Sequence, residues 1–471
     1  MQQYTPEHQC ELDDALATPE WQRAIESGFV EEVKRTRIEP GKTRNFIDTV
    51  VAELLRHNEA HARRVVADGI RDEARLLDIL ARWPDDLGGA DEADGRRNPP
   101  ITFLGLNVTT ACNFQPRCVY CNQEHVPEKV DLAGWKRIIA ESIGDAKDGG
   151  PYIYITGGEP LLLGEMIWGD DGIIRFATER GAAVNVNTNG VFITPEMALR
   201  FIKAGLSKLH ISLDTDDERL QNELRSGDRF AGILRGIYNV QLARDLVGVP
   251  YPVIHTNCVL TNRNLDLFPK LFEFILSRHK QTADRNDPFR NDLFPHVIPV
   301  GGRSNAPLRP SEAEFRRFYE TVWQDACRLW DEFQERLNVP KDQRAVLFGY
   351  FTNPFLRVEH KGGLDAYVKA SAEGVYGKLA LSRRCYVAPT QASFTPDGLQ
   401  FRCGSHAIRR IMPIGSANEN GLFDGIRRGM SGLADLPQEE LCFGCAMATL
   451  YINQSVEGKL KEKVKSLLDG Q

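Results

Sequence analysis

Between residues 101 and 300, short apolar runs alternate with amphipathic stretches of helical spacing. The apolar runs cover residues 101–108, 152–156, 183–188, 208–213, 253–260 and 294–300. The amphipathic stretches between them cover residues 132–146, 172–180, 195–204, 231–245 and 265–277. This alternation predicts a parallel sheet of strand–helix units, either a doubly wound sheet or a barrel. Six strands fall short of the eight units of a complete barrel.

The chemically distinctive residues of this segment follow the predicted strands. Three cysteines come after the first strand, a GGEP sequence at 157–160 follows the second, and an NTNG sequence at 187–190 closes the third. An SLD sequence at 212–214 ends the fourth predicted strand, and Thr261-Asn262 follows the fifth. Loops at the carboxyl ends of parallel strands carry the binding groups of such folds. We therefore expect one functional site at that edge of the sheet.

Cys112, Cys118 and Cys121 fall within ten residues on the loop after the first strand. Thiolates this close together bind a single soft metal centre. A mononuclear zinc ion normally takes four ligands, and His125 is the only further cysteine or histidine nearby. Three thiolates suit a 4Fe–4S cluster with one iron left open. The open iron implies that a substrate or cofactor binds to it.

A second group of cysteines comprises Cys385, Cys403, Cys442 and Cys445. The TPDG sequence at 395–398 predicts a tight turn between short strands at 391–394 and 399–402. Such a hairpin places Cys403 at the end of its second strand. Four thiolates suit either a structural zinc ion or an auxiliary iron–sulfur cluster, and the spacing alone leaves both open.

The segments outside the sheet are predicted to be helical. A proline at the first helical position after Thr18 starts a helix expected to reach about residue 35. Amphipathic spacing continues in 44–64 and 69–83, and a polar linker follows at 85–100. A capping box at Ser311 begins a further helix that is expected to run to about residue 337.

The length of 471 residues predicts two or three domains, and 42% apolar with 26% charged residues is typical of globular proteins. A net charge of −7 without a basic tract disfavours nucleic acid as a partner. The sequence lacks a run of eighteen apolar residues and begins with a polar, acidic stretch, so we expect neither a membrane span nor a signal peptide. Clustered cysteines in such a chain are typical of metal ligands in a reducing cytoplasm, which is the expected location.

Taken together, the three-cysteine loop, GGEP, TNG, SLD and the late cysteine group resemble the radical SAM superfamily, and within it the SPASM/twitch subgroup. The resemblance covers residues 101–452. The usual cluster loop of the family is C-x3-C-x2-C, whereas five residues separate Cys112 from Cys118 here. We expect an α/β fold with four parts. The helical periodicity predicts an N-terminal helical region at 1–98 and a helical or mixed connector at 311–384, and the resemblance implies a partial (β/α)6 TIM-like barrel at 99–310 and a twitch/SPASM-like iron–sulfur domain at 385–471.

The resemblance also implies cofactors and the residues that bind them. Cys112, Cys118 and Cys121 would hold a 4Fe–4S cluster whose open iron binds the amino and carboxylate groups of S-adenosylmethionine. Reductive cleavage of that molecule yields a 5′-deoxyadenosyl radical. The further cofactor-binding positions are Tyr120 near the adenine, Gly157, Gly158 and Glu159 around the methionine moiety, Ser212 and Arg225 at the carboxylate and ribose, and Asn189 and Asn257 as polar contacts.

In the late cysteine group, Gly398-x4-Cys403 matches the G-x4-C element of the subgroup. The resemblance therefore implies that Cys385, Cys403, Cys442 and Cys445 hold an auxiliary 4Fe–4S cluster. No cysteine follows Cys445, so one such cluster is expected, which is the twitch arrangement. Its implied role is to take or pass an electron, and a flavodoxin- or ferredoxin-type protein is the expected electron donor.

Three residues are candidates for acid–base or hydrogen-donor roles: His255, Cys258 and Cys327. His255 shares the strand phase of Asn257 and so faces the same side of the sheet, although a packed barrel histidine is the favoured reading. Cys258 is out of that phase and Cys327 lies mid-helix, so core packing is favoured for both.

We expect an enzyme that abstracts a hydrogen atom from a small sugar, aminocyclitol or amino-acid substrate, leading to oxidation, rearrangement or bond formation in natural-product biosynthesis. A peptide-modifying enzyme is the alternative. The N-terminal helices lack the strand-then-helix pattern of a leader-peptide module, which favours the small molecule. The rival from another class is a non-catalytic electron-transfer protein, which would not need GGEP, Ser212 and Arg225 as a cofactor site.

Overall fold

The structure is a computed structural model that describes residues 4–84, 98–144, 149–279, 294–301, 305–344, 363–375, 379, 382–419, 421–430 and 447–470. Its strands form one sheet in the order β6-β5-β4-β3-β2-β1-β7-β8-β9. Their bounds are β1 (Phe103–Thr109), β2 (Tyr152–Gly157), β3 (Ala183–Thr188), β4 (Lys208–Ser212), β5 (Val253–Leu260), β6 (Phe294–Pro299), β7 (Gln391–Phe394), β8 (Leu399–Phe401) and β9 (Gly415–Ser416). Strands β1 to β6 are parallel throughout, which confirms the predicted α/β fold with six strand–helix units.

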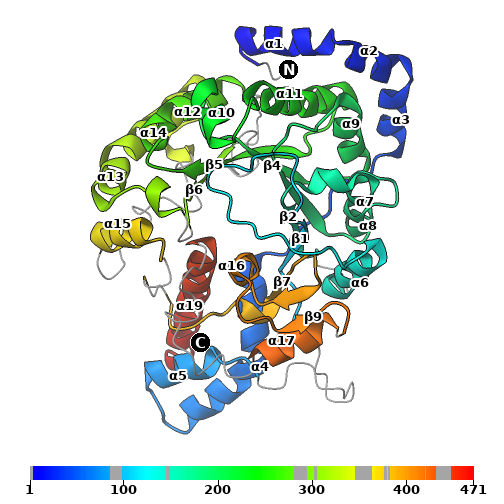
Figure 1. Cartoon of the computed structure of the whole chain (residues 1–471). Helices are drawn as coiled ribbons and strands as arrows, with labels where there is room; N and C mark the ends of the chain where they lie inside the picture. Colours follow the sequence, from blue (N-terminus) through cyan, green and yellow to red (C-terminus); the bar gives the residue numbers. More distant parts are fainter. Residues whose placement is uncertain are drawn as a thin grey trace.

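Helices cover one face of this parallel sheet (Figure 1). They are α6 (Leu132–Ile143), α7 (Glu165–Trp168), α8 (Ile173–Thr178), α9 (Pro195–Lys203), α10 (Glu218–Leu224), α11 (Phe230–Val247) and α12 (Phe268–Ser277). Strand residues on that face are apolar and fully buried, as Leu104, Ile155 and Val186 show. Since side chains alternate along a strand, the remaining residues point to the opposite side, which we call the inner face. Burial of the apolar face provides the main driving force for this part of the fold.

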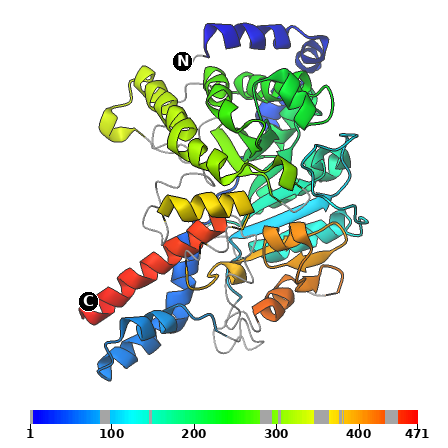
Figure 2. The same ribbon diagram turned by 60° about the vertical axis from the view of Figure 1, so that its left-hand side comes forward.

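The N-terminal helices divide between two ends of the molecule. Helices α1 (Pro6–Leu16), α2 (Pro19–Glu26) and α3 (Phe29–Thr36) lie over the barrel helices α9 and α11. Helices α4 (Phe46–Ala67) and α5 (Glu73–Leu80) pack against the C-terminal helix α19 (Met447–Leu468) at the far end (Figure 2). The prediction of a single helix from residue 19 to about 35 is wrong, because two helices, α2 and α3, occupy this segment. Gly28 adopts a left-handed conformation with φ of 77° and separates α2 from α3.

The C-terminal segment joins the barrel sheet. Strand β7 pairs in parallel with β1, on the side opposite β2, and the backbone N–H of Thr102 donates to Thr390 O at 2.7 Å. The predicted hairpin is present, because β7 and β8 are antiparallel around a turn in which Gly398 has φ of 90°.

The remaining helices are α13 (Glu312–Arg317), α14 (Trp323–Arg336), α15 (Gly363–Glu373), α16 (Gly404–Arg409) and α17 (Leu422–Met430). A π-helical turn at Phe318–Val322 lies between α13 and α14.

None of the described helices combines the length and apolar character needed to cross a lipid bilayer.

Trp21 anchors the first group of N-terminal helices to the barrel. Its side chain is fully buried, and its indole Nε1 donates to Asn239 Oδ1 of α11 at 2.9 Å. We expect Trp21→Ala to lower the free energy of unfolding by about 3–5 kcal/mol, because it leaves a large cavity and an unpaired amide oxygen. Ile25→Ala on the same helix is the control, since Ile25 is 40% exposed and its removal should change stability by less than about 0.5 kcal/mol. Urea denaturation followed by far-UV circular dichroism measures both, and equal midpoints for the two variants would contradict the anchoring role.

Candidate functional site

The three cysteines of the first loop share one neighbourhood beyond the carboxyl end of β1. Cys112 and Cys118 are half-buried and Cys121 is exposed. The backbone N–H of Cys121 donates to Cys118 O at 2.9 Å, and Phe114 N–H donates to Cys112 Sγ at 3.4 Å. Burial raises the pKa of the Cys112 thiol, and the nearby thiols of Cys118 and Cys121 raise it further. The structure therefore brings together the three thiols that the sequence singled out.

The five residues between Cys112 and Cys118 are anchored at both ends. Asn113 Oδ1 accepts from Asn189 Nδ2 at 2.7 Å, which ties the loop to the end of β3. Phe114 is buried beneath the guanidinium of Arg229, whose Cζ lies 4.7 Å from the ring centre. Arg117 donates to Gln123 O at 2.6 Å and to Thr110 O at 3.0 Å. The additional length is thus taken up by specific packing against the neighbouring barrel loops.

A buried ion pair fixes the other end of the loop. Arg225 Nε lies 2.7 Å from Asp214 Oδ2, and their side chains are 7% and 0% exposed. Tyr120 Oη donates to the same carboxylate oxygen at 2.5 Å, and the Arg225 guanidinium lies 5.4 Å from the Tyr120 ring centre. Asp214 Oδ1 accepts from Val259 N–H of β5 at 2.8 Å.

These charges act on the adjacent cluster loop. Burial works to lower the pKa of Arg225, but Asp214, Tyr120 and Cys118 together outweigh it and hold the pKa above its ordinary value. Arg225 Nη1 lies 3.9 Å from Cys118 Sγ. Burial raises the pKa of the Cys118 thiol, and the positive charge of Arg225 opposes that effect. Arg225 therefore holds Tyr120 and Asp214 while placing a positive charge beside a thiol.

The glycines of GGEP allow the end of β2 to pass close to the cluster loop. Gly157 has φ of 151°, and a Cβ atom there would lie 2.2 Å from Thr109 O. A Cβ atom on Gly158 would lie 2.0 Å from Ala111 O. Backbone hydrogen bonds of 2.8 Å run from Gly158 N to Thr109 O and from Glu159 N to Ala111 O. Any side chain at either position would force this loop away from β2.

Glu159 joins the GGEP turn to the TNG loop. Its side chain is fully buried, and Oε1 accepts from Leu161 N at 3.0 Å and from Thr188 Oγ1 at 2.8 Å. Oε2 accepts from Asn189 N at 2.8 Å. Burial raises the pKa of Glu159 to about 7 in spite of these three donors. Both carboxylate oxygens thus hold the loops after β2 and β3 in place.

Polar side chains line the inner face just below the strand ends. Asn257 Nδ2 donates to Asn187 Oδ1 at 2.7 Å, and Ser212 lies beside Asn257 in the β4–β5 register. Several buried polar atoms of this face have no hydrogen-bond partner among the described residues: Asn107 Oδ1, both amide atoms of Asn185, His210 Nε2 and Ser393 Oγ. Buried polar atoms of proteins are almost always paired, so these atoms require partners from water or from a bound polar molecule.

The candidates for acid–base or hydrogen-donor roles occupy different places. His255 lies on the inner face, where its Nδ1 is 2.8 Å from His296 Nε2. Cys258 is buried on the other side of β5, and its thiol lies 3.4 Å from Asp214 O. Cys327 is half-buried on α14, where burial raises its pKa to about 11. Neither cysteine side chain is placed with His255 on the inner face.

In the late cysteine group, Cys385 and Cys403 are described and both are half-buried. Asn453 Nδ2 of α19 lies 3.7 Å from Cys385 Sγ, and Cys403 is the residue that precedes α16. Cys442 and Cys445 lie outside the described residues.

Sequence reasoning missed His210 and His296, which join His255 on the inner face. Both occur in predicted strands, but the sequence does not give the register that places them beside His255. The role of Asp214 was also missed, because in the sequence it is only the last letter of SLD.

The residues present fit the cofactors implied by the sequence. Thiols are the protein ligands of 4Fe–4S clusters, and three of them leave one iron open. The unpaired Asn107 Oδ1, 3.1 Å from where a Cβ atom of Gly157 would lie, places a buried acceptor next to the GGEP turn.

The Radical SAM superfamily matches residues 106–275, from β1 to α12. The chain contains a radical SAM domain. Such domains use a 4Fe–4S cluster and S-adenosylmethionine, which are the two cofactors that the sequence predicts. The cluster loop, GGEP, TNG and SLD all lie inside the matched segment.

Two curated relatives are similar over part of their length. The AdoMet-dependent heme synthase of Nitratidesulfovibrio vulgaris is 28% identical over 197 residues, covering 40% of this chain and 49% of the relative. The probable GTP 3′,8-cyclase of Methanopyrus kandleri is 34% identical over 178 residues, covering 37% and 52%. The chain thus spans about half the length of the curated relatives it matches.

Among solved structures, native anSMEcpe with bound AdoMet and Cp18Cys peptide is similar to this chain, with a TM-score of 0.50 at 13% identity. The match covers 79% of this chain and all of the other, which supports the fold.

The raised pKa of Glu159 predicts a pH-dependent stability. The folded chain holds this proton with a pKa of about 7, above the ordinary value of 4.5. The contribution of this proton to the free energy of unfolding is fully present below about pH 4.5. It is lost as the pH rises from there through 7, which lowers the free energy of unfolding by roughly 3 kcal/mol. We expect Glu159→Gln to remove this part of the pH dependence in the cluster-free protein. The control Glu165→Gln, at an exposed position nearby, should retain it. Urea denaturation at pH 5, 6, 7 and 8 measures the difference, and identical pH profiles for the two variants would contradict it.

Proposed function

We propose that this chain is a radical SAM enzyme rather than a non-catalytic electron carrier. Its proposed substrate is a small polar molecule, such as a sugar, an aminocyclitol or an amino acid, bound against the inner face of the sheet. The observation that carries the proposal is the group of unpaired polar atoms there, from Asn107, Asn185 and Ser393. Leaving a buried polar atom unpaired costs about 1–3 kcal/mol. Hydroxyl and amine groups of such a substrate would pair with them, whereas an apolar substrate would not.

The proposed cofactor site lies at the carboxyl ends of the same strands. Cys112, Cys118 and Cys121 would hold a 4Fe–4S cluster which, together with S-adenosylmethionine, supplies a radical that abstracts a hydrogen atom. The chain's own residues set the position of that chemistry. Gly157 and Gly158 bring β2 against the cluster loop, and Glu159 fixes the TNG loop beside them.

The other side of the cofactor site is formed by polar residues of β3, β4 and β5. Ser212, Asn189 and Asn257 are the proposed polar contacts, and Asn189 is itself held by Asn113. Arg225 and Tyr120 are fixed through Asp214, so their side chains are already ordered. Groups held in place before a ligand binds lose little entropy on binding, which favours a well-defined position for the reacting atoms.

We further propose that Cys385, Cys403, Cys442 and Cys445 hold an auxiliary 4Fe–4S cluster rather than zinc, as in a twitch-type domain. Such a cluster would provide a one-electron acceptor or relay, which suits a reaction that ends in oxidation, rearrangement or bond formation. A flavodoxin- or ferredoxin-type protein is the proposed reductant.

A peptide is the second candidate substrate. It is favoured by the similar solved structure, which holds a bound peptide. The small molecule is preferred because the unpaired polar groups sit on the buried inner face of the sheet, and because the names of the two curated relatives refer to heme and GTP, which are small molecules.

The proposal predicts that anaerobically reconstituted protein, given dithionite and S-adenosylmethionine, releases 5′-deoxyadenosine. Changing Cys112, Cys118 and Cys121 together to alanine should abolish release and remove about four irons per chain, while any auxiliary cluster remains. Cys10→Ala is the matched control, because Cys10 is exposed on α1 and should not affect either quantity. A fully loaded protein that releases no 5′-deoxyadenosine would refute the cofactor site.

The substrate class is tested in the same assay with deuterated candidates. Transfer of deuterium from a sugar, aminocyclitol or amino acid into 5′-deoxyadenosine would support the proposal. Transfer from peptides alone would overturn the small-molecule assignment in favour of the second candidate.

A further inference from the structure

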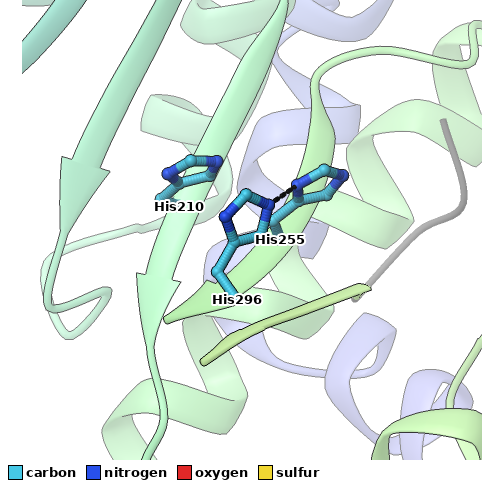
Figure 3. Close-up of side chains that lie close together, drawn as sticks. All are labelled: His210, His255 and His296. Carbon is cyan, nitrogen blue, oxygen red and sulfur yellow. Dashed lines mark hydrogen bonds between the residues drawn. The ribbon is translucent and has the colours of Figure 1, made fainter. Parts of the chain in front are cut away.

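Three histidines from adjacent strands converge on the inner face of the sheet. His210 is on β4, His255 on β5 and His296 on β6, and Figure 3 shows their rings turned toward one another. One ring nitrogen of each lies within 4.8 Å of the other two. Ring centres are 5.5 Å apart for His210 and His255, 4.6 Å for His210 and His296, and 4.8 Å for His255 and His296.

We propose that His210, His255 and His296 form a binding site for a divalent transition-metal ion such as Zn²⁺, with a fourth position left for a ligand on the inner face. Three imidazole ligands with one open position make up a common zinc arrangement in proteins. The proposal concerns a different place from the cysteine loop, and it does not depend on which substrate the enzyme takes.

The spacing of the nitrogens is close to what a bound ion requires. Metal–nitrogen distances of about 2.0–2.1 Å in a tetrahedral site separate the ligand nitrogens by about 3.3 Å. His255 Nδ1 and His296 Nε2 are 2.8 Å apart, so this pair needs to open slightly, while His210 needs to move inward. Rotation of the ring about the side-chain torsions is enough for shifts of this size, because the backbones are already held in neighbouring positions of one sheet.

The protonation states suit metal binding. Burial lowers the pKa of His296 to about 3 and that of His210 well below its usual value. Both rings are therefore neutral at pH 7 and offer a lone pair. A hydrogen bond between His255 and His296 alone would explain those two residues but not the third. His210 Nε2 is buried and has no hydrogen-bond partner among the described residues.

The surroundings also indicate the charge of the fourth ligand. Lys208 is near enough that its charge contributes to lowering the pKa of both His210 and His296. A divalent ion bound by three neutral rings favours an anionic ligand, because the two positive charges of the ion are not balanced by the rings. We therefore assign the open position to an anionic oxygen, such as hydroxide or a carboxylate or phosphate group of a bound molecule.

The position of the site relates it to the cofactor residues. In the β4–β5 register His210 pairs with His255, and Ser212 pairs with Asn257 two residues further along. His210 and His255 thus lie one layer deeper in the barrel than Ser212 and Asn257, and His296 lies level with Asn257 in the β5–β6 register. An anionic group held by the ion would be anchored below the place where the radical chemistry is proposed to occur.

The test uses holoenzyme with its iron–sulfur clusters loaded, so that the cysteines are occupied. After incubation with Zn²⁺ and removal of excess, inductively coupled plasma mass spectrometry should find about one more zinc per chain in the wild type than in His210→Ala, and the variant should bind Zn²⁺ at least tenfold more weakly. His279→Ala is the matched control, because His279 is also a buried histidine but lies at the end of α12. It should keep the zinc of the wild type.

A second measurement needs no variant. Crystals of the wild-type holoenzyme are treated with Zn²⁺, and anomalous maps are collected above and below the zinc edge. The difference between the two maps should show a peak between the three histidines. Equal zinc contents and affinities in the wild type and His210→Ala, or an anomalous peak elsewhere with none at this position, would overturn the proposal whatever the activity of the enzyme.

Discussion

The buried ion pair between Asp214 and Arg225 is the interaction on which the proposed site most depends. Asp214 lies at the end of β4, and its two oxygens accept from Tyr120 on the cluster loop, from Arg225 at the end of α10 and from the backbone of β5. A carboxylate with no exposed surface is stable only when it is paired and hydrogen-bonded, so these partners cannot be lost singly without a large cost. The pair therefore fixes the loop that carries the cysteines relative to the sheet.

Other contacts also hold the cysteine loop in position. The GGEP glycines allow backbone hydrogen bonds between β2 and the loop, and Glu159 holds the neighbouring TNG loop from inside the protein. Asn113 then connects the loop to Asn189. These contacts together hold the loop that carries the three cysteines in one position. Position and shielding are what a protein contributes when a cofactor carries the chemistry.

Much of this could be predicted from the sequence. The six parallel strands followed from alternating apolar runs, because a sheet covered by helices requires one fully apolar face, as Leu104 and Val186 illustrate. The motif residues were correctly placed at strand ends for the same reason. The break at Gly28, the pairing of β7 with β1 and the histidine group could not be predicted in the same way. Each depends on a local backbone angle or on contacts between residues far apart in the chain, and hydrophobic periodicity carries information about neither.

We propose that the cysteine loop and the Tyr120, Asp214 and Arg225 group form one site at which S-adenosylmethionine binds the cluster. Electron paramagnetic resonance of the dithionite-reduced protein, recorded with and without S-adenosylmethionine, tests it most directly. The account predicts a cluster signal that changes on addition of the molecule in the wild type. In Arg225→Lys, which keeps a positive charge beside Asp214, the same iron signal should persist but change only at higher concentrations. A wild-type spectrum that is the same with and without S-adenosylmethionine, in protein with a full complement of iron, would contradict the account.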